Sequence, residues 1–233
     1  MRRTPLLASA AVILTVACDP TGNVGPSSPS TKFRFANAVA DATGLAVKEN
    51  GVSVVSNVTF GSVSSSQSIS PESSILEIRR NSDDFLLGTD TLVAASGKKY
   101  TMYGLGIVGN FRSLILVDDT VFADSGKFKV RFVHGVDDQD AFGLDLYVTA
   151  SATDISGVTP QVASLSFGAA SNYFQNDTSS RRLRVTRAGQ TTVIFDTTFS
   201  ATFPDSQVVT VVASDKANGG PPPKFTVVID RAP

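Results

Sequence analysis

The feature that most constrains the fold is a strand-like unit that occurs twice in the chain. Residues 32–37 alternate basic and aromatic side chains, and residues 127–134 repeat that alternation. Phe60-Gly61-Ser62-Val63-Ser64 is likewise answered by Phe167-Gly168-Ala169-Ala170-Ser171. Successive side chains of a strand point to opposite faces, so alternation with a period of two indicates strands rather than helices. The sequence therefore predicts two copies of one β-rich unit.

The alternation also assigns a face to each side chain. Phe35 and Phe132 hold equivalent positions, and we expect each to be buried in the core of its own module. Arg131 lies on the opposite face from Phe132, where a solvated sheet surface is expected. With few contacts crossing near residues 124–126, the two modules would unfold separately.

Short strand-like runs separated by turn residues recur within each copy. No window shows a sustained helical period. This pattern predicts an all-β fold of two tandem antiparallel β-sandwich modules, immunoglobulin-like in strand number, over residues 32–124 and 127–233. In the first copy the expected strands are residues 33–36, 45–48, 52–60, 75–79, 90–94, 100–105 and 112–117.

The N-terminus has the character of a targeting segment. Arg2 and Arg3 precede an uncharged apolar run over residues 6–17, too short for a membrane-spanning helix, which needs about 20 residues. Small residues precede Cys18, as in a bacterial lipobox, so residues 1–17 are predicted to be a lipoprotein signal peptide and Cys18 a lipidation site. Residues 18–31 read as a flexible tether. The alternative is an ordinary secretory signal, with Cys18 an incidental free thiol.

The repeated motifs carry a family resemblance. The motifs are residues 34–38, 60–64, 99–101, 131–135 and 167–173. They resemble the bacterial family called domain of unknown function 4397. That resemblance implies tandem copies in a secreted or lipid-anchored envelope protein, and the family offers no established catalytic residues to transfer.

Composition argues against several function classes. Arg2 and Arg3 belong to the 20 basic residues, so the chain from Cys18 onward has 18 basic and 21 acidic residues, a net charge of −3. A basic surface for nucleic acid is therefore not expected. One Cys and one His exclude intramolecular disulfides and zinc sites built mainly from these residues. No cofactor or metal is predicted.

Three motifs suggest chemistry, and each has a simpler structural interpretation. Gly104, Gly106 and Gly109 match G-x-G-x-x-G, but the next segment continues as a strand, which favours a hairpin over a dinucleotide site. His134 corresponds to Asn37 at the end of the equivalent strand, which favours a structural role over catalysis. The acidic run Asp137–Asp140 favours a solvated loop over a Ca²⁺ site.

These features together predict a non-catalytic, lipid-anchored protein of the bacterial cell envelope with its body outside the cytoplasm. Its two modules would serve binding, adhesion or surface architecture. Cys18 would provide the membrane attachment, and the ligand would be a polysaccharide or a protein. The alternative function is that of a secreted hydrolase that uses the Asp137–Asp140 loop and His134.

Overall fold

The computed structural model describes residues 31–69, 71–137, 142–150, 152–179, 181–198, 203–218 and 223–232. Cys18, the predicted signal peptide and most of the predicted tether lie outside the described residues. So do Asp138, Gln139 and Asp140 of the acidic run. All the regular elements of the described part are strands, and no helix in that part could cross a membrane.

The strands divide evenly between the two copies of the repeat. The first module contains β1 (Thr31–Val39), β2 (Leu45–Glu49), β3 (Val52–Val58), β4 (Gln67–Ile69), β5 (Ser73–Arg80), β6 (Leu86–Val93), β7 (Lys99–Ile107) and β8 (Asn110–Val117). The second contains β9 (Lys127–Gly135), β10 (Leu144–Ala150), β11 (Val162–Leu165), β12 (Phe174–Asp177), β13 (Arg181–Arg187), β14 (Val193–Thr198), β15 (Val208–Ser214) and β16 (Lys224–Arg231).

Each module is a sandwich of two four-stranded sheets, and the strand order is the same in both. The first module has the orders β4-β1-β7-β8 and β3-β2-β5-β6, and the second has β12-β9-β15-β16 and β11-β10-β13-β14. The prediction of two tandem β-sandwich modules is confirmed. All seven strands expected in the first module are present, and β4 is an eighth that the sequence analysis did not predict.

One pairing in each module differs from the purely antiparallel arrangement that was predicted. β1 runs parallel to β7, and β9 runs parallel to β15. The two strands of each pair are far apart in sequence, because the chain between them crosses to the opposite sheet of the sandwich. Such a long connection permits parallel pairing, whereas a short hairpin does not.

The inner faces of the two sheets form the core of each module, as the alternation predicts. Phe33 and Phe35 are fully buried in the first core, and Phe128 and Phe132 are buried in the second. The aromatic face of each alternating strand is therefore assigned correctly.

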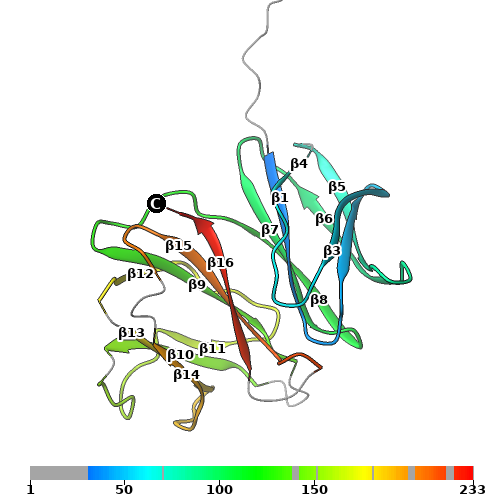
Figure 1. The fold of residues 1–233 in the computed structure, drawn as a ribbon. Coiled ribbons are helices and arrows are strands. Elements are labelled where there is room, and N and C mark those ends of the chain that lie inside the picture. Colours follow the sequence, from blue (N-terminus) through cyan, green and yellow to red (C-terminus); the bar gives the residue numbers. More distant parts are fainter. Residues whose placement is uncertain are drawn as a thin grey trace, which may run out of the picture.

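The opposite face of each alternating strand is also covered, so that its charged side chains are buried or half-buried, which was not predicted from the sequence. The β1–β7 sheet of one module packs against the β9–β15 sheet of the other, so the chain forms four stacked layers (Figure 1). We call this contact between the modules the seam. Its apolar part comprises Ala36, Ala38, Tyr103, Leu105, Val133, Val212 and Val228. Arg131 lies in the seam with 4% of its surface exposed, so the expectation of a solvated face there is wrong.

Candidate functional site

A polar network crosses the seam and begins at Arg34 in β1. Arg34 Nε donates to Thr101 Oγ1 of its own module at 2.8 Å. Its Nη2 contacts Asp118 at 3.0 Å and Asp230 of the second module at 2.7 Å. Its Nη1 donates to the main-chain oxygen of Ile229 at 2.6 Å. One guanidinium thus binds both modules.

Arg131 in β9 makes the bonds that correspond to those of Arg34 with its own threonine and across the seam, in the reverse direction. Its Nε donates to Thr210 Oγ1 at 2.8 Å, and its Nη1 donates to the main-chain oxygen of Val117 in the first module at 2.9 Å. Its Nη2 contacts Asp118 at 3.1 Å. Because equivalent residues exchange equivalent bonds, the two modules meet as a pseudo-twofold pair, like the identical subunits of a dimer.

The strand pattern explains why these residues meet. Each arginine alternates with core phenylalanines, so it projects from the outer face of its sheet. Thr101 and Thr210 lie directly beside the arginines on the parallel neighbours β7 and β15. With Asp118 and Asp230, the network contains two positive and two negative charges. Buried ion pairs add little net stability, but they impose one docking geometry because any other arrangement would leave a charge unpaired.

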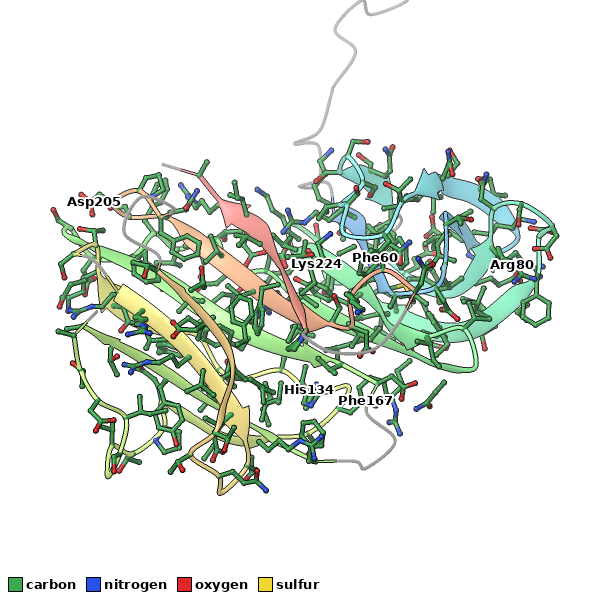
Figure 2. All side chains as sticks on the ribbon, turned by 60° about the horizontal axis from the view of Figure 1, so that its bottom comes forward. Phe60, Arg80, His134, Phe167, Asp205 and Lys224 are labelled. Atoms are coloured by element: carbon green, nitrogen blue, oxygen red, sulfur yellow. The ribbon has the colours of Figure 1, made fainter. Side chains whose placement is uncertain are left out.

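A second reciprocal pair of contacts lies further along the seam. Lys224 of β16 lies over the ring of Phe60, 4.7 Å from its centre, and Arg112 of β8 lies over the ring of Phe167 at 5.4 Å. Figure 2 shows Lys224 beside Phe60. In each pair a cation of one module covers an aromatic ring of the other.

Burial governs the protonation of the network. The pKa of Asp230 is raised to about 6, mainly by burial and next by the neighbouring carboxylate of Asp118. The hydrogen bond from Thr210 and the charge of Arg131 lower this pKa. Burial also raises the pKa of Tyr103 and of Tyr173, so both phenols stay neutral, and the hydroxyl of Tyr173 donates to Asp230.

Two cavities open beside this network. The smaller, of about 200 Å³, is lined by Lys32, Arg34, Ser66, Lys99 and Asp118 among others. The larger, of about 520 Å³, shares Lys99 and Asp118 with it and extends to Tyr173. Both are polar, and together they place lysines and a buried carboxylate at one end of the seam.

His134 lies outside the lining of both cavities and is held by the backbone. It is 1% exposed, and its Nδ1 accepts from the main-chain N–H of Val136 at 3.2 Å. In the first module Asn37 Oδ1 accepts from the N–H of Val39 at 3.0 Å. The two side chains therefore perform the same task, and Figure 2 shows His134 beside Phe167, the ring it meets edge-on.

The glycine motif forms a hairpin. β7 and β8 pair directly, with Ile107 opposite Asn110, so no helix follows the glycines. Gly106 has a φ of +83°, a left-handed backbone conformation that glycine adopts readily because it has no β-carbon. The motif therefore offers no helix N-terminus to a pyrophosphate.

The structure describes only the first residue of the acidic run. Asp137 Oδ1 accepts from Asn110 at 2.7 Å, and its main-chain N–H donates to Asp215. Within the residues that the structure describes, no three His, Cys, Asp or Glu side chains come together in a way that could hold a metal ion.

The seam network was not predicted from the sequence, although one signal was present. β15 is buried at every position, and β7 at all positions except its two ends. Strands buried on both faces read as nearly continuous apolar runs, as Val208–Ser214 does. That signal indicates a covered outer face, and hence that the charges beside it are buried too.

Comparison with known proteins identifies a family but no activity. The family model described as "Domain of unknown function (DUF4397)" matches residues 31–147. No curated protein matches the chain.

Two solved bacterial structures show a distant likeness. The first, described as "Alpha-glucan binding by a streptococcal virulence factor", is 10% identical with a TM-score of 0.29, over 84% of this chain and 96% of that one. The second, the family CBM26 module CBMbc of Amy13K from Eubacterium rectale in complex with maltoheptaose, is 10% identical with a TM-score of 0.26, over 88% and 98%. TM-scores this low transfer no ligand to this chain.

Proposed function

We propose, from the premise that the chain belongs to the family described as Domain of unknown function (DUF4397), that it is a non-catalytic binding protein of the cell envelope. It is held on the membrane by a lipid on Cys18, and its two modules act as one rigid unit. The ligand, a polysaccharide or a protein, binds beside the seam.

The reciprocal bonding of Arg34 and Arg131 carries this proposal. Each guanidinium contacts Asp118 and a main-chain oxygen of the other module, which fixes the two sandwiches in one geometry. A surface that is rigid before binding loses less entropy when a ligand arrives. The polar cavities at the end of the seam are formed by this fixed arrangement, and they supply the recognition groups.

The anchor is tested by comparing the wild type with Cys18→Ser. The wild type should take up a palmitate analogue and partition into the detergent phase, because two or three acyl chains hold a protein stably on a membrane. Cys18→Ser should lose both properties. A wild type that is unlabelled and fully soluble would refute the anchor and leave simple secretion.

The binding role is tested with the detergent-solubilised full chain immobilised on beads. A component of the native envelope should be retained by the wild type and lost with Lys99→Glu, which reverses a charge that lines both cavities. Lys216→Glu makes the same change at an exposed position away from the seam cavities and should retain the component. Equal retention by both variants would place binding elsewhere.

A hydrolase remains the competing function, and His134 decides between them. Its ring is 1% exposed and bonded to the backbone, which leaves it badly placed to meet a substrate. The wild type should show no turnover on panels of esters, glycans and peptides. Turnover that disappears in His134→Asn, a change that supplies the acceptor found at Asn37, would favour the hydrolase.

A further inference from the structure

The pseudo-twofold relation between the modules is broken at Tyr173. The bridge of Val133 with Ala170 matches that of Ala36 with Val63, and these registers make Ser66 the equivalent of Tyr173. A large aromatic side chain in the second module thus corresponds to a small hydroxyl in the first.

Tyr173 completes one half of the network. Its ring lies 4.6 Å from the guanidinium carbon of Arg131, and its hydroxyl donates to Asp230 Oδ2 at 2.8 Å. The Arg131 side chain is 5% exposed beneath this ring. A phenol therefore covers the arginine and bonds to the carboxylate of the same module.

The other half of the network has the arginine and the carboxylate but lacks the phenol. No ring of the described residues lies over Arg34, whose side chain is 15% exposed. Ser66, Arg34 and Asp118 instead border the cavity of about 200 Å³. An apolar cavity of about 150 Å³ in another protein accommodates benzene, so this space is large enough for a phenol ring.

Asp118 retains the capacity to accept one more hydrogen bond. Its donors are Thr101, Arg34 and Arg131. Thr101 has a single hydroxyl hydrogen, so these side chains supply three hydrogens to a carboxylate with about four acceptor positions. Asp230 likewise accepts from three side chains, Thr210, Arg34 and Tyr173, so a phenol is already one of the donors that this type of carboxylate binds in the network.

The cavity also has a positive rim. Lys32 and Lys99 line it, and the acids that face it, Asp118 and Asp230, are already paired with arginines. The lysine charges are therefore not neutralised by the carboxylates of the cavity. A ligand that brings its own acidic group would meet them favourably.

We propose that this cavity binds a para-hydroxyphenyl ring that bears an acidic group. The ring stacks on Arg34, the hydroxyl donates to Asp118, and the acid faces Lys32 and Lys99. This inference rests on the proposed binding role and names the chemistry of the ligand. The ring can come from a free phenolic acid or from a tyrosine at the C-terminus of a peptide.

The first test measures binding of 4-hydroxyphenylacetate to the detergent-solubilised full chain by calorimetry. One equivalent should bind, whereas phenylacetate, which lacks the hydroxyl, and tyramine, which lacks the acid, should each bind at least about tenfold more weakly. A short peptide ending in tyrosine, tested in parallel, distinguishes the two sources. The proposal would be overturned if neither 4-hydroxyphenylacetate nor the tyrosine peptide bound, or if all the probes bound equally.

Paired variants locate the site. Ser66→Tyr should fill the cavity with the chain's own phenol, raise the melting temperature and abolish probe binding. Ser65→Tyr adds the same ring one residue earlier, where the side chain lines a different groove, and should leave binding intact. Lys99→Glu should weaken the acidic probes at least about tenfold. Binding that survives both Ser66→Tyr and Lys99→Glu would overturn the proposal.

The reverse substitution gives a positive control. Tyr173→Ser should lower the melting temperature and open a second, equivalent space, so the variant should bind two equivalents of 4-hydroxyphenylacetate and regain part of its lost stability. A single equivalent there would contradict the equivalence of the two positions. If no probe binds the wild type while the envelope component is still retained through Lys99, the proposed binding role stands and this inference alone fails.

Discussion

Arg131 of the second module lies 3.1 Å from Asp118 of the first, and both side chains are almost completely buried in the seam. Each module thus supplies an arginine that pairs with a buried carboxylate of the other module. The seam is therefore part of the folded structure, and the modules are not independent domains joined only by a linker.

Removal of the Arg131 side chain should strongly destabilise the folded chain. Arg131→Ala leaves Asp118 with one charged partner fewer in a buried site, and removing one partner of a buried pair costs about 3–5 kcal/mol of unfolding free energy. Arg182→Ala is the matched control, because Arg182 pairs with Asp196 at the surface and exposed pairs contribute about 1 kcal/mol or less. Urea unfolding measures both. Similar losses in the two variants would show that the Arg131 pair is not buried in solution.

The stability of the chain should carry a pH signature from Asp230. Burial and the Asp118 charge raise the pKa of Asp230 to about 6 from an ordinary value of 3.8. Between these values the folded chain holds a proton that the unfolded chain has released, so the contribution of Asp230 to stability falls as the pH rises through this window. A shift of this size corresponds to about 2–3 kcal/mol.

The measurement is the unfolding free energy of the wild type minus that of Asp230→Asn, at several pH values from 4 to 7. The subtraction removes the other carboxylates, including Asp119, whose pKa is lowered by Lys129 and acts in the opposite direction. The difference should decrease from pH 4 to pH 7. A difference that is constant or that increases would refute the raised pKa.

The glycine motif should respond to alanine in a position-dependent way. Gly106 has a positive φ, and a β-carbon there would lie 2.5 Å from the main-chain oxygen of Asn110 and 2.9 Å from the Phe167 ring across the seam. Gly106→Ala should cost more than about 1 kcal/mol, because it combines left-handed strain with a clash. Gly109→Ala meets no atom within 4 Å and should be nearly neutral. Thermal unfolding compares the two, and equal effects would contradict the assigned hairpin geometry.

Much of the fold could be predicted from sequence because alternation reports burial directly. Phe35 and Phe132 lie in the two cores, as the pattern indicated. β4 was not predicted because Gln67-Ser68-Ile69 is too short to show a period of two. It is a strand because it pairs with β1, which is distant in sequence. The parallel pairing of β1 with β7 depends on a crossover that a local pattern cannot show.

The seam was not predicted because alternation separates two faces without saying what covers the polar one. Arg131 has the same local pattern whether its face meets water or another sheet. The exchange of Ser66 for Tyr173 was visible in the aligned repeats, but its meaning depends on the arginine beneath the ring. The chemistry of the site therefore arises from the contact between the modules, which neither copy of the repeat specifies alone.

Differential scanning calorimetry of the wild type and of two core variants tests the central claim, that the seam joins the modules into one cooperative unit. Phe35→Ala and Phe132→Ala should each cost about 3–5 kcal/mol, because both rings are buried. The wild type should unfold in a single transition, and each variant should move that whole transition to lower temperature. Two transitions, of which Phe132→Ala moves only one, would contradict the account and mean that the modules fold independently.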